Sequence, residues 1–168
     1  MIYIDEVTLY PLNAEELSLW LNDLPQLEKK LDCKYCAEPM EGIFKDVVQS
    51  ELILAMSDIS ENWLWYTFWF MIRKSDRKVI GSLCFKGAPE NNNGETEIGY
   101  GLGKDFEHHG YMTKSVKALC DWALQQPGVK AITAETDLDG KASQNILLRC
   151  GFTQTHTTDQ AAYYKKTL

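Results

Sequence analysis

The stretch Glu97-Ile-Gly-Tyr-Gly-Leu-Gly-Lys-Asp-Phe-Glu-His-His-Gly-Tyr-Met-Thr-Lys114 decides the fold of this chain. It predicts a strand over 95–102, a polar connection over 103–110 and the start of a helix over 112–126. The first backbone amides of a helix have no partner inside it and carry the positive end of the helix dipole. The corner between this strand and this helix is therefore a candidate anion-binding site, and an ordinary strand–turn–helix corner is the alternative.

Three residues of this corner suit a phosphate group as the anion. Gly110 lets the backbone approach a phosphate closely, because glycine carries no side chain. Thr113 adds a hydroxyl one turn into the site, and Lys114 adds one positive charge. We therefore expect the corner to cradle phosphate mainly through its backbone amides.

The apolar periodicity of the remaining chain predicts a mixed α/β fold. No internal repeat, low-complexity tract or linker interrupts the pattern, so we expect residues 1–168 to form a single domain. The other predicted elements are, in order, a strand over 2–10, a helix that Asn13 caps and Pro25 stops, a helix over 40–59, a hairpin of strands over 63–73 and 79–85, a strand over 130–136, a helix over 142–149, and two final strands over 152–156 and 162–166.

Composition and charge argue against several classes of protein. The chain has 168 residues, 45% of them hydrophobic, and a net charge of −7. This acidity repels a nucleic acid backbone and no Lys/Arg run exceeds two residues, so nucleic acid is not an expected partner. No segment reaches the roughly 18 apolar residues that a membrane span needs, and no signal peptide is visible, so we expect a cytoplasmic protein without membrane contact. The five cysteines are an odd number, which argues against a disulfide framework.

Three segments resemble, in order and in spacing, motifs of the GNAT superfamily of acyl-CoA N-acyltransferases. They are Glu97-Ile-Gly-Tyr100, His109-Gly-Tyr-Met-Thr113 and Ser143-Gln-Asn-Ile-Leu-Leu-Arg-Cys-Gly-Phe152, which are similar to the family's central strand, pyrophosphate loop and last helix. The resemblance covers residues 78–152 and looks closest to the branch of ribosomal-protein N-terminal acetyltransferases. It implies a mixed, mostly antiparallel central sheet with a splay between the fourth and fifth strands and helices on both faces.

The resemblance also implies that acetyl-CoA is the cosubstrate. No metal is expected, because His108 and His109 are adjacent and adjacent residues rarely aim at one metal. Acetyl-CoA would lie in the splay between strands 97–102 and 130–136, with its pyrophosphate on the amides of 108–113. Residues 78–152 would form the acetyl-CoA core, and residues 10–75 would form the acceptor side. The residues implied to contact the cofactor are Gly99, Tyr100, Gly101, Leu102, Gly103, His108, His109, Gly110, Tyr111, Met112, Thr113, Lys114 and Ser143.

Three residues depart from the pattern of this branch. Glu107 stands where the pyrophosphate loop normally begins with Arg or Gln, and its charge should cost phosphate affinity unless the side chain turns away. His108 stands at a usual Gly. Gly140 replaces an Asn three residues before Ser143, so Asp139 or a water would have to do what that Asn does.

Acetyl transfer to nitrogen needs an uncharged amine and an acid that protonates the departing thiolate. Glu97 on the central strand is the candidate base, acting through a water, and a solvent-facing strand carboxylate is the alternative. Ser143 resembles the thiolate acid proposed for this branch. It is equally suited to capping its helix.

The leading hypothesis is an N-acetyltransferase that moves an acetyl group from acetyl-CoA to a primary amine by direct attack in a ternary complex. The acceptor, a peptide N-terminus or a small amine, stays open, as does the oligomeric state, for which a homodimer is one option. The alternative is a degenerate GNAT-fold module that binds CoA or a protein partner without turnover, motivated by Glu107, Gly140 and Met112. A dinucleotide-binding oxidoreductase, suggested by Gly99-Tyr-Gly-Leu-Gly103, fails because the next helix starts too far beyond the third glycine.

Overall fold

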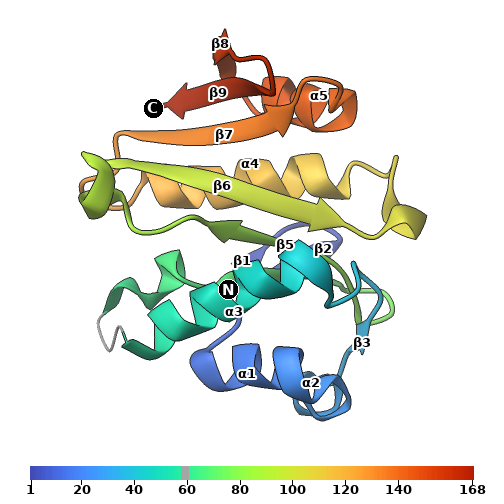
Figure 1. Cartoon of the computed structure of the whole chain (residues 1–168). Coiled ribbons are helices and arrows are strands. Elements are labelled where there is room, and N and C mark those ends of the chain that lie inside the picture. The colour runs from blue at the N-terminus through green and yellow to red at the C-terminus, as the bar shows by residue number, and fades with distance from the viewer. Residues whose placement is uncertain (58–60) are drawn as a thin grey trace.

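The computed structural model describes residues 1–57 and 61–168 (Figure 1). Its helices are α1 (Ala14–Asn22), α2 (Leu24–Leu31), α3 (Gly42–Ser57), α4 (Tyr111–Leu124) and α5 (Lys141–Arg149). Its strands are β1 (Ile2–Tyr3), β2 (Val7–Pro11), β3 (Lys34–Tyr35), β4 (Phe68–Arg73), β5 (Lys78–Phe85), β6 (Glu95–Leu102), β7 (Ala131–Asp137), β8 (Thr153–Thr157) and β9 (Ala161–Thr167).

The strands form one open sheet in the order β1-β2-β4-β5-β6-β7-β9-β8, with β3 beside β5. Neighbours along this order are antiparallel except β6 and β7, which run parallel. β6 and β7 pair only where residues 95–97 face residues 131–133, and beyond that point β6 follows β5 while β7 follows β9. The sheet therefore opens between β6 and β7 after Glu97, which confirms the predicted splay.

Helices cover both faces of the sheet (Figure 1). On one face, Trp20 of α1 packs against Phe68 and Phe70 of β4 at ring-centroid distances of 5.3 and 4.8 Å. Side chains alternate across a strand, so Trp69 points to the other face, where it meets Trp122 of α4 at 5.1 Å. α5 contributes to the same cluster as α4. The predicted α/β class with helices on both faces is confirmed.

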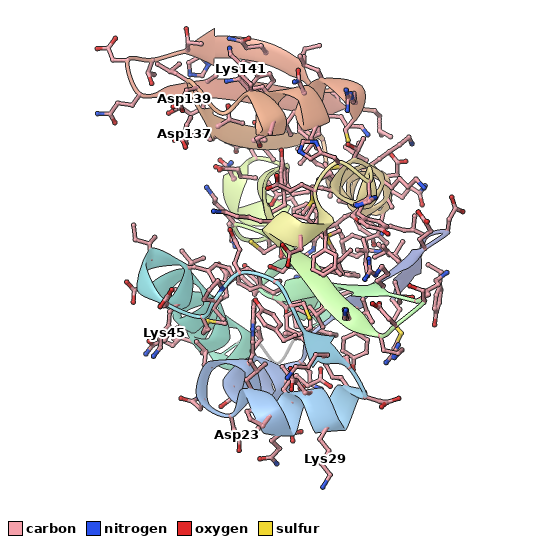
Figure 2. All side chains as sticks on the ribbon, turned by 90° about the vertical axis from the view of Figure 1, so that its right-hand side faces the viewer. Asp23, Lys29, Lys45, Asp137, Asp139 and Lys141 are labelled. Carbon is pink, nitrogen blue, oxygen red and sulfur yellow. The ribbon has the colours of Figure 1, made fainter. Side chains whose placement is uncertain are left out.

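The N-terminal region contains one helix more than the two predicted there. Pro25 does not simply stop a helix. It lies in the first turn of α2, where its missing N–H removes no helical hydrogen bond. Asp23 follows the end of α1, and its side chain caps α2 by accepting a hydrogen bond from the Gln26 amide at 3.1 Å. Figure 2 labels Asp23 and Lys29 on this outer layer of the molecule.

Three predicted elements have different bounds. The strand predicted over 2–10 is divided into β1 and β2 by a turn in which the Ile4 amide donates to the Val7 carbonyl at 2.9 Å. The strand predicted from residue 63 begins only at Phe68, because Glu61–Trp65 form a 3-10 turn that lets Trp65 pack on Trp122. The helix predicted over 40–59 is α3, and the last two residues of that prediction lie outside the described residues.

Candidate functional site

A cavity of about 490 Å³ opens beside the splay, between the end of β6, the start of α4 and one face of α5. It brings together residues from three distant parts of the sequence. Its lining consists of Tyr100, Gly101, Leu102, Glu107, His108, Gly110, Tyr111, Met112, Thr113, Ala142, Ser143, Asn145, Ile146 and Arg149.

Four of the residues implied to contact the cofactor lie outside this lining. Lys114 turns toward the β1–β2 turn, with its Nζ 3.3 Å from the Glu6 carboxylate. The His109 ring lies 5.6 Å from the Tyr111 ring. Gly99 faces β5, and Gly103 borders a second cavity.

The start of α4 has the geometry of an anion cradle. No described side chain caps this helix, and its first backbone bond runs from the Lys114 amide to the Gly110 carbonyl at 3.1 Å. The amides of the first helical turn, over 111–113, therefore lack helical partners, and all three residues line the cavity. Gly110 has a φ of 77° and His108 a φ of 65°, both in the left-handed region. His108 thus holds a conformation that suits the glycine of the resembled motif.

The charges around the cradle have opposite signs. Glu107 is half exposed, and its carboxylate lies 3.9 Å from the His108 imidazole. Arg149 lines the same cavity from the last turn of α5 and makes no ion pair with any residue in 1–57 or 61–168. The sequence reasoning missed this cation. The helical spacing Ala142, Asn145, Ile146, Arg149 could have indicated that it shares the cavity-facing side of α5.

Tyr100 and Ser143 bridge the splay. The Tyr100 hydroxyl lies 2.7 Å from the Ser143 Oγ, which links β6 to α5. Ser143 is the third residue of α5 and Gly140 is the N-cap, so the suggestion that Ser143 caps its helix is wrong. Burial raises the pKa of Tyr100 to about 12, so its phenol stays protonated at neutral pH.

The backbone of β6 offers hydrogen-bonding groups to the open side of the splay. The Glu97 carbonyl accepts from Lys86 of β5 at 2.8 Å, and the Gly103 amide donates to Ile80 at 2.9 Å. Peptide groups alternate in direction along a strand, so the N–H and C=O groups of Tyr100 and Leu102 point away from β5. Beyond Glu97 no described strand pairs with β6 on that side. These groups are free to pair with a ligand.

The predicted base, Glu97, lies on the face of β6 opposite to the Tyr100 side chain. Glu97 is partly buried, with a side-chain exposure of 29%, and forms an ion pair with Lys86 of β5. Although burial opposes the effect, this contact raises the pKa of Lys86, so the ammonium stays charged. The next two residues on this face of β6 are glycines. A Cβ atom at Gly101 would collide with the Glu38 carboxylate, so the loop before α3 lies directly over the strand.

A second cavity, of about 390 Å³, lies between that loop and residues 102–105. Its charged lining is mainly acidic, with Glu38, Glu41 and Asp105 against Lys104. Leu102 lines both cavities, so the two are neighbours at the end of β6. The arrangement places an acidic, amine-compatible space beside the cavity that holds the anion cradle.

Gly140 and Asp139 lie at the turn from β7 to α5, where Figure 2 shows Asp139 beside Asp137 and Lys141. Asp139 is exposed, and neither residue belongs to the lining of the larger cavity. Gln144 stabilises this turn by donating to the carbonyls of Asp137 and Leu138 at 3.0 and 3.1 Å.

A family model of the acetyltransferase (GNAT) domain matches residues 10–153, and the chain belongs to this family. Over 97 residues it is 33% identical to an uncharacterized N-acetyltransferase, YjdG, of Bacillus subtilis (strain 168), which covers 58% of this chain. The chain spans 55% of the length of this curated relative.

Solved structures with the same fold include two ribosomal-protein acetyltransferases. Ribosomal-protein-S5-alanine acetyltransferase from Vibrio fischeri superposes with a TM-score of 0.70 at 15% identity, covering 99% of this chain and 95% of that one. RimL, a ribosomal L7/L12 alpha-N-protein acetyltransferase in complex with coenzyme A, gives 0.64 at 15% identity, covering 98% and 96%. The family model confirms the resemblance to the GNAT superfamily that the three motifs indicated, and these solved structures share its fold.

Within 1–57 and 61–168 no helix is long and apolar enough to cross a membrane. The same part of the chain contains no group of three or more His, Cys, Asp or Glu side chains placed to hold a metal ion.

Proposed function

We propose that this protein transfers an acetyl group from acetyl-CoA to a primary amine by direct attack in a ternary complex. The observation that carries the proposal is the single cavity in which an uncapped helix start, free strand amides and the Tyr100–Ser143 pair come together. A ligand with both phosphates and an amide-bearing arm matches this set of groups.

The described residues offer a place for each part of acetyl-CoA. The amides of 111–113 would take the pyrophosphate, and Arg149 would add a positive charge. The free backbone groups of Tyr100 and Leu102 would pair with the pantetheine amides, as a neighbouring strand does. An amide of β6 near Tyr100 would donate to the thioester carbonyl as negative charge develops on its oxygen.

Two side chains are candidates for moving protons. Glu97 would take a proton from the acceptor ammonium. A water would carry this proton, because Lys86 already contacts the Glu97 carboxylate. Ser143 would donate a proton to the departing thiolate, and Tyr100, hydrogen-bonded to the Ser143 hydroxyl, would position it. The acidic cavity beside Glu38 and Glu41 favours an acceptor that arrives as a cation.

The test is thiol release from acetyl-CoA with a panel of short peptides, polyamines and amino acids. We expect release with at least one amine, and we expect Glu97→Gln to lower kcat roughly 100-fold or more at neutral pH with acetyl-CoA affinity nearly unchanged. High pH should restore part of the loss, because the amine then arrives uncharged.

The competing function is CoA binding without turnover, which Glu107 motivates because it departs from the family's pyrophosphate loop and lines the cavity. It predicts calorimetric binding of acetyl-CoA with no thiol release on any amine of the panel. Absence of binding as well would contradict both functions.

A further inference from the structure

The loop over 103–110 leads from β6 to the anion cradle at the start of α4 and makes few contacts of its own. Two backbone hydrogen bonds close its 3-10 turn, Lys104–Phe106. No described residue accepts a hydrogen bond from the amides of 108–110. The side chains over 107–110 are all exposed. The conformation of the loop therefore depends on the residues that anchor its two ends.

The two anchors are the aromatic rings of Phe106 and Tyr111. Phe106 is 7% exposed, and Tyr111, the first residue of α4, is 8% exposed. Both belong to the same hydrophobic cluster, and Tyr111 also lines the larger cavity. A shift of either ring would move the backbone between them, which includes Gly110, and with it the first amides of α4.

Arg73, the last residue of β4, contacts both anchors. Its guanidinium lies 4.9 Å from the centre of the Phe106 ring, which is a cation–π contact. Hydrogen bonding to Asp76, and next to Tyr111, raises the pKa of Arg73, so the guanidinium also lies beside Tyr111. One side chain thus connects both ends of the loop to the central sheet.

The guanidinium is held in one orientation by the hairpin of β4 and β5. Its Nε and Nη2 atoms donate to the two carboxylate oxygens of Asp76 at 3.0 and 2.7 Å. Two parallel bonds of this kind fix the plane of a guanidinium as well as its place. Arg73 is not among the residues that line the larger cavity, and its charge is paired with Asp76. It would therefore act on a ligand through the loop.

We propose that Arg73 is a positioning residue for acetyl-CoA, because it holds the loop over 103–110 so that the amides of 111–113 face the pyrophosphate. This assignment rests on the acetyl-CoA site proposed above. A loop that is ordered before the ligand arrives loses less conformational entropy on binding, so the contact raises affinity without touching the ligand. The reacting atoms would lie near the Tyr100–Ser143 pair, so the turnover rate of the saturated enzyme should not depend on Arg73.

The experiment compares two arginines of the same hairpin. Arg73→Met removes the guanidinium that contacts the loop. Arg77→Met is the matched control, because Arg77 donates instead to the carbonyls of Leu31 and Asp32 at the end of α2, at 2.7 and 3.0 Å. Calorimetric titration gives the dissociation constants of CoA and of pantetheine, which lacks the pyrophosphate. Urea unfolding gives the stability of each variant.

We expect Arg73→Met to raise the dissociation constant of CoA about tenfold and that of pantetheine by less than about twofold. Arg77→Met should leave both constants unchanged although it loses stability. In thiol-release assays, Arg73→Met should raise the KM for acetyl-CoA and leave kcat unchanged.

A conservative variant separates orientation from charge. Arg73→Lys keeps the positive charge but lacks the planar fork that binds Asp76 and stacks on Phe106, so it should lose CoA affinity as Arg73→Met does. It also provides the same comparison with Arg77→Met if Arg73→Met does not fold.

Four results would overturn the assignment. Equal losses of CoA and pantetheine affinity would show that Arg73 supports the whole site as a structural residue. Parental CoA affinity in Arg73→Met would show that the loop holds its conformation without this contact. Parental CoA affinity in Arg73→Lys alone would show that charge acts and orientation does not. If the unsubstituted protein binds no CoA, the acetyl-CoA site itself is refuted, and the role of Arg73 with it.

Discussion

Glu51, a buried residue of α3, holds its proton more tightly in the folded protein than in the unfolded chain, because burial raises its pKa from 4.5 to about 7. Between these two values Glu51 is more protonated in the native state than in the unfolded state, so the contribution of this residue to stability must fall as pH rises. A difference of this size corresponds to a free energy of unfolding on the order of 3 kcal/mol, most of it lost by neutral pH.

We therefore predict that Glu51→Gln removes this slope and makes the protein more stable than its parent above neutral pH. Urea unfolding at a series of pH values measures the effect, and Asp46→Asn, which changes an exposed acid on the same helix, serves as the control that keeps the parental slope. Parallel stability profiles for Glu51→Gln and the parent would show that the carboxyl group titrates normally.

Single residues are also where sequence reasoning failed most. The apolar spacing of α3 predicts its length, but Ile43 and Ile53 are exposed at 83% and 62% whereas Glu51 is buried. Hydrophobicity alone could not have placed a carboxylate on the inner face, because that placement costs free energy. The positions of Gly110 and Ser143 beside the larger cavity, by contrast, were predictable, since their neighbours in the sequence form recognisable local motifs.

At the scale of elements, the start of α4 depends on one backbone conformation. Gly110 has a φ of 77°, and a Cβ atom added there would meet no atom within 4 Å. Gly128, in the turn after α4, has a φ of 82° and equally open surroundings. Strain in the backbone is thus the only cost of an added methyl group at either position, about 1–2 kcal/mol.

We predict that Gly110→Ala and Gly128→Ala lower the free energy of unfolding by similar amounts. Only Gly110→Ala should weaken acetyl-CoA binding, by about tenfold, because the strained residue precedes the amides of 111–113. His108→Gly should strengthen acetyl-CoA binding instead of weakening it, since glycine adopts the left-handed conformation of this loop position without strain. Calorimetric titration with acetyl-CoA decides the matter, and an equal loss of affinity in both alanine variants would remove the cradle from the site.

The elements themselves were largely predictable, and the exceptions have physical causes. The strand–loop–helix succession of residues 95–124 follows from its periodicity and glycines. α2 was missed because a proline stops a helix and starts one equally well, and only Asp23, which caps the helix that follows, distinguishes the two outcomes. The 3-10 turn over Glu61–Trp65 was missed because tryptophans there pack against α4, a contact between residues far apart in sequence.

At the scale of the whole molecule, the sheet consists of two parts that meet along three residue pairs of β6 and β7. Beyond those pairs, the Tyr100–Ser143 hydrogen bond links the two parts across the splay. A ligand in the larger cavity would touch β6 and α4 on one side and α5 on the other. Binding should therefore stabilise both parts of the sheet together. The two parts already contact each other, so binding needs no free energy to bring them together.

We predict that acetyl-CoA at a hundredfold excess over its dissociation constant adds about 2.7 kcal/mol to the free energy of unfolding. For a chain of this size the gain corresponds to a rise of roughly 5–10 °C in melting temperature. NADH, which shares the adenosine and pyrophosphate but lacks the pantetheine, should give a much smaller shift. Arg149→Gln should reduce the acetyl-CoA shift at low salt more than at high salt, because its contribution is a charge at an exposed site, which salt screens. An unchanged melting temperature at millimolar acetyl-CoA would contradict the assignment of this cavity. Equal melting-temperature shifts with NADH and acetyl-CoA would mean that the start of α4 binds phosphates and that the splay does not bind the pantetheine.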